Sequence, residues 1–264
     1  MLIVPWSWLA LFLAAPLVIV CAIALLQPAD AIPPVALPPG FDALRQIAAD
    51  PLYAHALLLS LKVAAITSVA CLLIGYPMAL AIARAPAHRQ PWLLVLVMLP
   101  FWTGFLMRLN AWIGLLQDQG LLAAVLHTRL LYTDAGLYCG MVYTYVPFMI
   151  LPLYARLSRL DPALIEAAAD LGASPFRAFL FVVLPLSLPG VRAGLLLVFI
   201  PAIGEYVVPE LLGGPQAQLL GRVLWEEFFE NRDWPTAASL AVAMLALMAA
   251  AAALAALAGR MRRR

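Results

Sequence analysis

Charged side chains are scarce in this chain, since Asp, Glu, Lys and Arg make up 11% of its 264 residues. A soluble domain carries about 25% of them. Hydrophobic residues make up 65%, which is more apolar surface than a chain of this length encloses in a water-soluble core. The composition therefore excludes an ordinary soluble protein and predicts a membrane protein. The formal net charge of +2 is too small to suggest a nucleic-acid partner.

Cysteine and histidine are also rare, and neither forms a recognisable pattern. The chain has three of each, dispersed along the sequence: Cys21, Cys71, Cys139, His55, His88 and His127. An odd number of cysteines, each inside an apolar stretch, indicates small core or lipid-facing side chains rather than disulfides. No histidine has the spacing to a cysteine or to a second histidine that zinc sites use. The sequence therefore predicts no metal site.

Lysine is almost absent, and this excludes one activity directly. A phosphate-binding P-loop requires the pattern G-x-x-x-x-G-K-S/T, whereas the single lysine, Lys62, lies within an apolar run. The apolar runs also contain no nucleophile–base pair. We therefore expect a non-catalytic chain that hydrolyses no ATP and binds no cofactor itself.

Long apolar runs dominate the sequence. A helix needs about 20 apolar residues to cross the hydrocarbon core of a bilayer, and six runs qualify, at 4–26, 57–83, 92–116, 136–158, 183–204 and 236–259. The first run lacks the basic start and the A-x-A cleavage site of a secretory signal, so we expect it to be retained as a span. The predicted class is an all-α polytopic membrane protein with six transmembrane helices.

The runs divide the chain into three parts. Residues 1–55 hold the first span and an outer loop, and residues 56–259 hold a core of five spans with an inner loop at 156–184. Residues 260–264 form a basic tail. The longest segments between spans are too short for independent soluble cores.

Basic residues orient the spans, because cytoplasmic loops are enriched in Lys and Arg. With both termini inside, the inner segments hold Arg84, Arg89, Arg156, Arg159, Arg177, Arg260, Arg262, Arg263 and Arg264. The outer loops then hold only four arginines, Arg45, Arg129, Arg222 and Arg232, together with most of the acids. The two distributions agree, so the sequence predicts an N-in, C-in topology.

The inner loop contains a short helix with clear start and stop signals. Asp161 is an N-cap candidate, and Pro162 occupies the first helical position. Strong helix formers continue to Leu171, and Gly172 fits a left-handed stop. Ser174 and the proline after it then begin a second helix that runs into the fifth span. The loop is therefore predicted to place a short helix across the inner mouth of the bundle.

Two interpretations of this short helix are open. Glu166 and Asp170 share one face at i, i+4, and small residues surround them. A compact helix of this kind can enter a groove on a partner and transmit motion. Alternatively it rests on the membrane surface, although helices that do so are usually basic and this one is acidic. We favour the partner groove.

The same loop resembles a known motif. Glu166-Ala167-Ala168, then Gly172, then Val182-x-Leu184-Pro185 is similar to the EAA motif of binding-protein-dependent ABC import permeases, with Val182 where the family usually has Ile. The resemblance implies a type I ABC importer permease fold and a coupling helix that docks into a cytoplasmic ABC ATPase dimer, which holds ATP and Mg. The implied ATPase-coupling residues are Glu166, Ala167, Ala168, Asp170, Gly172 and Phe176.

Further stretches narrow the resemblance. From about residue 50 onward the chain looks like permeases of spermidine/putrescine-type importers, on the segments Pro100–Thr103, Tyr145–Met149, Ile200–Tyr206, Pro209–Gly214, Gly221–Trp225 and Asn231–Pro235. It is most similar to the type that partners a second, homologous permease. The resemblance implies a multi-pass protein of the bacterial inner membrane that moves polyamines delivered by a periplasmic binding protein.

Aromatic and acidic residues supply a physical counterpart to this substrate class. A flexible polycation favours carboxylates and aromatic faces along its route, and the candidate pathway residues are Trp102, Trp112, Tyr145, Glu205, Tyr206 and Glu210. Interfacial belts explain such aromatics equally well, and Glu205 is alternatively a plain loop carboxylate. Lys62 and Arg108 are expected to bond carbonyls, to pair with a carboxylate or to snorkel, rather than to contact a cation.

Other functions remain open at this stage. Another small organic cation or an opine is an alternative cargo, because the EAA loop is blind to substrate. A gradient-driven secondary carrier is a different class, and it predicts a carboxylate or histidine buried in mid-span, which the sequence does not offer. The acidic and aromatic segment from Trp225 to Trp234 is either a docking surface for the binding protein or an interfacial anchor.

Overall fold

The computed structural model of the chain describes residues 3–30 and 32–261, with side chains for residues 5–30 and 32–253. Helices make up most of it. The predicted basic tail falls mainly on Arg262–Arg264, which lie outside the described residues. Within these described ranges, five helices are long and apolar enough to cross a membrane, or up to six if one bent pair counts as a single span.

The first span is a continuous run of three helical pieces, α1 (Ile3–Leu9), the π-helical segment η1 (Ala10–Ala14) and α2 (Ala15–Ile23). Four further long helices follow: α4 (Pro51–Arg84), α8 (Asp134–Leu157), α11 (Leu184–Ile203) and α14 (Trp234–Met261). Each matches a predicted span. The second span, α4, starts earlier than the sequence predicts. Pro51 occupies its first helical position, and the Asp50 side chain caps it by accepting from the Leu52 amide at 2.8 Å.

The predicted third span at 92–116 is not one straight helix. It consists of α5 (Gln90–Met98), the 3₁₀ segment η2 (Leu99–Trp102) and α6 (Phe105–Leu116), and the segments Gln90–Trp102 and Phe105–Leu126 meet at 88°. The break falls where Thr103 Oγ1 turns back to bond the Pro100 carbonyl at 2.7 Å. The hydropathy of the sequence does not reveal this turn, because apolar residues continue on both sides of it.

Three helices form the centre of the bundle: α4, α8 and α11 pack against one another. Met149 of α8 is fully buried where they meet. A Cβ atom on Gly75 of α4 would lie 3.0 Å from Met149 Cγ, and one on Gly194 of α11 would lie 2.5 Å from Met149 Sδ. Glycines thus let both neighbouring helices close on α8, as small residues do in membrane helix packing.

Buried hydroxyl groups add polar ties to this centre. The Tyr76 hydroxyl of α4 and the Ser187 hydroxyl of α11 are hydrogen-bonded at 2.8 Å, and Ser187 also donates to the Leu184 carbonyl. Toward the other end of α4, Ser60 accepts from the Leu220 amide at 2.7 Å. Each tie satisfies a polar group that has no water to bond in the bundle interior.

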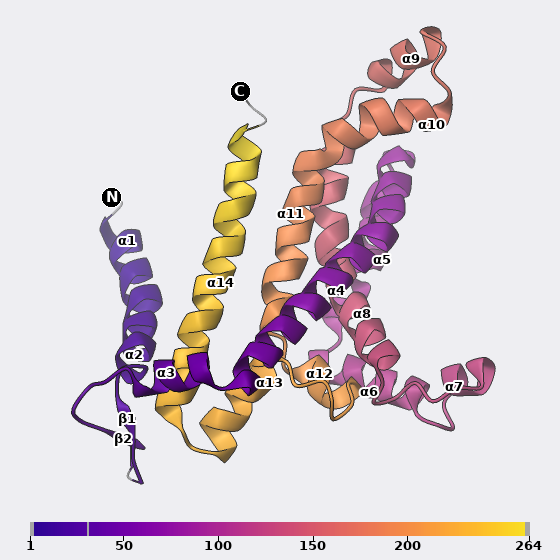
Figure 1. The fold of residues 1–264 in the computed structure, drawn as a ribbon. Coiled ribbons are helices and arrows are strands. Elements are labelled where there is room, and N and C mark those ends of the chain that lie inside the picture. The colour runs from indigo at the N-terminus through magenta and orange to yellow at the C-terminus, as the bar shows by residue number, and fades with distance from the viewer. Residues whose placement is uncertain (1–2, 31, 262–264) are drawn as a thin grey trace.

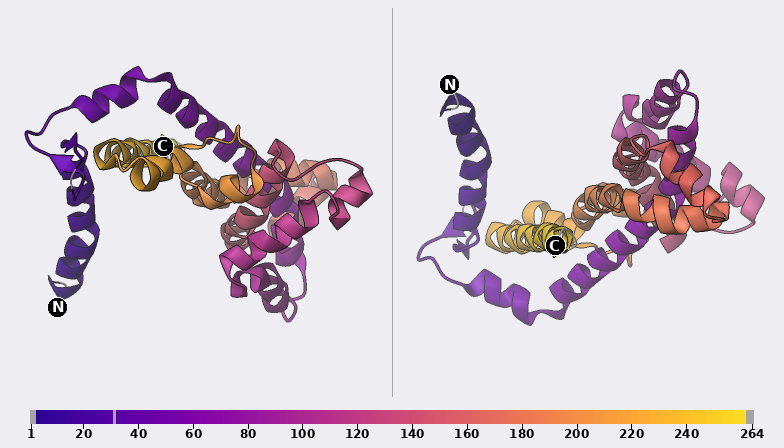
Figure 2. Two further views of the ribbon diagram at one scale, coloured as in Figure 1. Left: turned by 90° about the horizontal axis from the view of Figure 1, so that it is seen from below. Right: turned by 90° about the horizontal axis from the view of Figure 1, so that it is seen from above.

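The first span lies apart from this centre (Figure 1). No residue of η1 or α2 is buried, and among the long helices α2 packs mainly on α14. Both views in Figure 2 place it at one edge of the molecule, with α14 between it and the other long helices. Its apolar surface is therefore available to lipid or to a partner helix.

The two ends of the bundle differ in character (Figure 1). Both chain ends and the short helix α9 (Pro162–Asp170) lie at one end, which we call the coupling end. The opposite end, which we call the outer end after its predicted orientation, carries short elements: β1 (Gln27–Pro28) paired antiparallel with β2 (Val35–Ala36), α3 (Asp42–Ala49), α7 (Leu121–Leu126), α12 (Val207–Leu212), α13 (Leu220–Trp225) and η4 (Glu226–Glu230).

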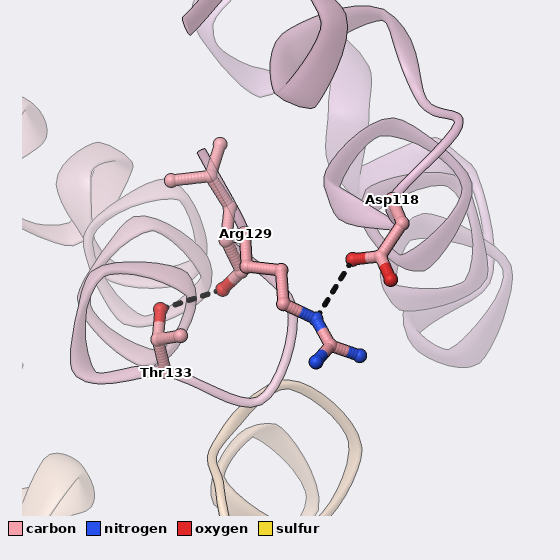
Figure 3. A network of polar contacts seen from close by, with 4 residues as sticks. Asp118, Arg129 and Thr133 are labelled. Carbon is pink, nitrogen blue, oxygen red and sulfur yellow. Dashed lines mark hydrogen bonds and ion pairs between the residues drawn. The ribbon is translucent and has the colours of Figure 1, made fainter. Parts of the chain in front are cut away.

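An ion pair at the outer end joins the segments on either side of α7. Figure 3 shows Arg129 reaching toward Asp118, with Nε 3.1 Å from Oδ1, while Thr133 donates to the Leu130 carbonyl. Thr133 also caps α8 by accepting from the Gly136 amide at 3.3 Å. The Asp118–Arg129 pair is well exposed, so it contributes about 0–1 kcal/mol. The cap, rather than the pair, fixes where α8 begins.

Candidate coupling helix and outer mouth

Helix α9 begins as its sequence predicts. Asp161 Oδ1 accepts a hydrogen bond from the Ala163 amide at 3.0 Å, and Pro162 is the first helical residue. This cap satisfies an amide that would otherwise have no partner within the helix. The next helix, α10 (Pro175–Ala178), starts in the same way, because Ser174 Oγ accepts from the Arg177 amide at 3.4 Å.

Helix α9 is terminated by Gly172, which lies just beyond it and whose φ of +81° is in the left-handed region. The Gly172 amide donates to the Ala169 carbonyl at 2.8 Å, and the Ala173 amide donates to the Ala168 carbonyl at 3.0 Å. This is the hydrogen-bond pattern of a Schellman stop, which favours glycine. The chain then turns sharply into α10, which continues through the π-helical segment η3 (Phe179–Val183) into α11. The predicted corner is confirmed.

The predicted coupling residues lie on an open surface. Glu166, Ala167, Asp170, Gly172 and Phe176 are exposed, and Ala168 is half-buried. Two large apolar side chains of the same surface are also exposed, Leu171 to 90% and Phe176 to 70%. Exposed apolar groups next to carboxylates at the end of a membrane protein favour a protein partner. We use the name α9 surface for the surface formed by Glu166, Ala167, Ala168, Asp170, Leu171, Gly172 and Phe176.

A cavity separates α9 from the bundle. It has a volume of about 490 Å³ and is lined by Ile165 and Glu166 of α9, by Leu80 and Arg84 of α4, and by residues of α10 and η3. Helix α9 makes few contacts with the bundle beyond α10 and η3. It therefore projects from its own chain and presents its far side outward.

The helices behind α9 are tied together at the same end. The Gln90 side chain donates to the Ala83 and Ala85 carbonyls at 3.2 and 2.9 Å, and it accepts from the Tyr154 hydroxyl at 2.8 Å. Arg156 Nε donates to the Leu186 carbonyl at 2.9 Å. The first group joins α4, α5 and α8, and the second joins α8 to α11. The sequence pattern does not point to these residues, since nothing local marks their partners.

At the outer mouth two of the predicted pathway residues contact each other directly. The Tyr145 hydroxyl of α8 donates to Glu205 Oε2 at 2.5 Å. Tyr145 is 6% exposed, and Glu205 is half-buried between α11 and α12. The other Glu205 oxygen accepts backbone amides at the start of α12. The two side chains are thus close together but already engaged within the chain.

Tyr206 and Glu210 belong to a neighbouring charged and aromatic group. Arg222 Nε lies 2.9 Å from Glu210 Oε2 and 3.0 Å from Glu226 Oε1. Beside them Tyr206 stacks on Trp225, with ring centroids 4.6 Å apart. Ring contacts continue through the residues Trp225, Phe229, Phe228 and Trp234. One guanidinium thus partly neutralises two carboxylates next to a row of aromatic faces.

Trp102 and Trp112 lie on either side of the bend in the third span. Trp102 is 78% exposed, and Trp112 packs edge-on against Tyr143 of α8 with centroids 5.3 Å apart. That the six aromatic and acidic residues line a pathway stays a prediction. They do not form one continuous group by direct contact, although four of them gather around α12.

Arg108 departs from the sequence expectation of a carbonyl or carboxylate partner. Its guanidinium lies 4.6 Å from the centroid of Phe101 and 5.6 Å from that of Phe105. Nε and Nη1 are buried and have no hydrogen-bond partner among the described residues. Cation–π attraction to the two rings replaces the expected bonds. The neighbouring Asn110, in contrast, donates to the Leu106 carbonyl at 3.0 Å.

Comparison with known proteins agrees with this architecture. Residues 1–263 match the family model described as "binding-protein-dependent transport system inner membrane component". The chain is 39% identical over 252 residues to the spermidine/putrescine transport system permease protein PotB of Haemophilus influenzae, covering 92% of this chain and 87% of that protein. It is 40% identical over 203 residues to PotB of Escherichia coli, covering 74% of each chain.

Solved structures share the fold at low identity. A bacterial ABC transporter that imports the acidic polysaccharide alginate has a chain with a TM-score of 0.67 and 18% identity, covering 100% of this chain and 94% of that one. The alginate transporter in complex with a pentasaccharide-bound periplasmic protein gives a TM-score of 0.72 and 17% identity, covering 97% and 91%. The family match and the PotB relatives confirm the resemblance drawn from the motifs, and this chain belongs to the family of binding-protein-dependent transport system inner membrane components.

Proposed function

We propose that this chain is a permease subunit of an ATP-driven ABC importer in a bacterial inner membrane, and that it moves polyamines such as spermidine and putrescine. The observation that carries the importer is the α9 surface, a capped helix that ends at a left-handed glycine and projects from the bundle. The observation that supports the cargo is the identity of 39–40% to relatives named for spermidine/putrescine transport.

The proposed partners follow from the surfaces that the chain leaves open. An ABC ATPase dimer, with its ATP and Mg, would dock on the α9 surface from the cytoplasm. A second, homologous permease would complete the pore, which is supported by the first span standing apart with no buried residue in η1 or α2. A periplasmic binding protein would deliver the cargo to the outer end, and a solved alginate transporter of the same fold is described in complex with such a protein.

The proposed topology puts both termini in the cytoplasm. Both chain ends lie at the coupling end together with α9 (Figure 1), so an ATPase on α9 requires that end to face the cytoplasm. The positive-inside distribution of arginines supports the same orientation. The bent pair Gln90–Trp102 and Phe105–Leu126 would count as the sixth span, with a turn of 88° at the break.

In the proposed mechanism the chain itself performs no bond chemistry. Closure of the ATPase dimer moves α9, and the Gly172 corner passes that movement through α10 and η3 into α11. The ties at Gln90 and Arg156 make α4, α5, α8 and α11 move together. The outer mouth then opens to the binding protein and afterwards releases the cargo inward.

Uptake by the complete complex tests the cargo. The complex of this chain, the second permease and the ATPase is reconstituted in liposomes with ATP inside and the loaded binding protein outside. We expect accumulation of labelled spermidine or putrescine that needs hydrolysable ATP and that unlabelled polyamines suppress.

Competition distinguishes the alternatives. Uptake of neither polyamine, with uptake of an opine or of another organic cation, would refute the polyamine assignment and keep the ABC permease. Accumulation that follows an ion gradient and persists without ATP would instead identify a secondary carrier. A non-hydrolysable ATP analogue inside the liposomes is the matched control.

A further inference from the structure

Glu205 has an unusually complete set of partners. Its Oε1 accepts hydrogen bonds from three successive backbone amides, those of Tyr206 at 3.2 Å, Val207 at 3.1 Å and Val208 at 3.4 Å. Its Oε2 accepts from the Tyr145 hydroxyl at 2.5 Å. The amides belong to the start of α12, where a negative charge is favoured, and hydrogen bonds to an ionised acceptor are among the stronger ones. The carboxylate is therefore fully engaged within the chain.

The helix that Glu205 holds is seated tightly on α8. Val208 and Leu212 of α12 are both fully buried. They occupy the space next to Gly140 of α8, where a Cβ atom would collide with Leu212 and lie 2.9 Å from Val208 Cγ1. The Leu212 carbonyl also accepts from the Tyr132 amide at 3.1 Å, just before α8. The Glu205–Tyr145 bond thus closes one end of a packed contact between α12 and α8.

The position of Glu205 along the chain connects the contact between α12 and α8 to helix α11. Glu205 follows the last residues of α11, and α11 is continuous with α10 and with the corner at Gly172. Helix α12 in turn carries Glu210, whose carboxylate pairs with Arg222 of α13. A displacement that enters at α9 therefore reaches the outer mouth through the joint that Glu205 forms between α11, α12 and α8.

We propose that Glu205 is a positioning residue, whose carboxylate fastens α12 to α8 so that the outer mouth moves as one body with the central helices. A transported ammonium group would have to compete with four donors for this carboxylate. The proposal is therefore an alternative to a role for Glu205 as a ligand of the cargo. Its transport consequence rests on the proposed function, whereas its structural consequence does not.

The structural consequence is tested by thiol accessibility in the purified full complex. Val208→Cys is introduced with the two exposed cysteines replaced, as Cys21→Ser and Cys139→Ser, while Cys71 is buried and stays. A thiol at position 208 is buried when α12 is seated. We expect Tyr145→Phe or Glu205→Gln to raise its rate of labelling by a maleimide about tenfold or more, since a hydrogen bond to a charged group is lost.

Ala237→Cys on α14 provides the matched control, because Ala237 is also buried but lies away from α12. Its labelling rate should be the same with and without Tyr145→Phe. If labelling at position 208 does not change in either variant, the fastening role is wrong. Tyr145→Phe keeps the ring and its packing, so the test does not depend on a variant that fails to fold.

The transport consequence is tested by the ratio of the two polyamine uptake rates. A positioning role predicts that Tyr145→Phe and Glu205→Gln lower the maximal rates for spermidine and putrescine by the same factor, about tenfold, and that the double variant is no worse than either single one. A ratio that changes with Glu205→Gln but not with Tyr145→Phe would identify a cargo ligand and overturn the proposal. A positive labelling result without polyamine uptake in the unmodified complex would contradict the proposed function and leave the fastening role intact.

Discussion

Glu166→Lys is expected to abolish ATP-driven uptake and to release the ATPase from the complex. Glu166 is exposed on the α9 surface and forms no ion pair within the described part of the chain. The proposed docking buries Glu166 in the interface with the ATPase, where the loss of a hydrogen-bonded charge costs about 2–5 kcal/mol, which corresponds to a loss of at least about thirtyfold in association. Co-purification of the ATPase and uptake in liposomes measure the two effects.

Asp118→Lys is the matched control for this substitution. Asp118 is an exposed acid at the outer end, and its pair with Arg129 is exposed as well. The same charge reversal there should leave ATPase co-purification unchanged. Equal amounts of bound ATPase and equal uptake for Glu166→Lys and for the unmodified chain would contradict the docking of α9.

Gly194→Leu is expected to lower the thermal stability of the complex strongly. A Cβ atom at Gly194 would lie 2.5 Å from Met149 Sδ and 3.3 Å from the Met149 carbonyl oxygen. Met149 cannot move away freely, because Gly75 of α4 confines it from the other side. Overpacking of a well-packed core costs about 1–3 kcal/mol of folding free energy, occasionally more. We expect a leucine where three helices meet to cost an amount at the upper end of this range. Thermal unfolding of the purified complex measures the loss.

The same change at Gly114 provides the comparison. Apart from its chain neighbours and the backbone of its own helix turn, no described atom lies within 4 Å of a Cβ atom there, and the residue is exposed on α6. We expect Gly114→Leu to shift the unfolding temperature little. If both leucine variants unfold at the temperature of the unmodified complex, the close packing of α4, α8 and α11 around Met149 is wrong.

Features that depend on neighbouring residues were predictable from the sequence. The start of α9 at Asp161 and Pro162 and its stop at Gly172 follow from caps and turns within a few positions. The long apolar runs identify four of the core helices in the same way, since a span depends on length and hydropathy alone. These local signals are sufficient to locate helix α9 and its corner from the amino-acid sequence alone.

The bend of the third span was missed because its cause is a small polar turn inside an apolar run. Thr103 bonds back to the Pro100 carbonyl, and Gly104 precedes α6. Proline, threonine and glycine within a few residues were the available signal. Prolines also occur inside the straighter helices α8 and α11, at Pro147 and Pro189, so proline alone does not decide between a bend and a span.

The partners of Glu205 and Gln90 were not predictable, because they are distant in sequence. Glu205 bonds Tyr145 across 60 positions, and Gln90 bonds Tyr154 across 64. The sequence marked Glu205 as an ionisable group near a helix end, which suggested the cargo route. Only the packing of α12 on α8 indicates that the carboxylate bonds Tyr145 and the start of α12. The role of Glu205 is therefore tested by the seating of α12 as well as by polyamine uptake.

Crosslinking from α9 tests the central claim most directly. Ala167→Cys, introduced together with Cys21→Ser and Cys139→Ser, places a single exposed thiol on the α9 surface, and Ala124→Cys on α7 places one at the opposite end. In membranes that contain the complete complex, we expect a short thiol-to-amine crosslinker to join position 167 to the ATPase and position 124 to none of it. Absence of an ATPase adduct from position 167, or its appearance from position 124, would contradict the account.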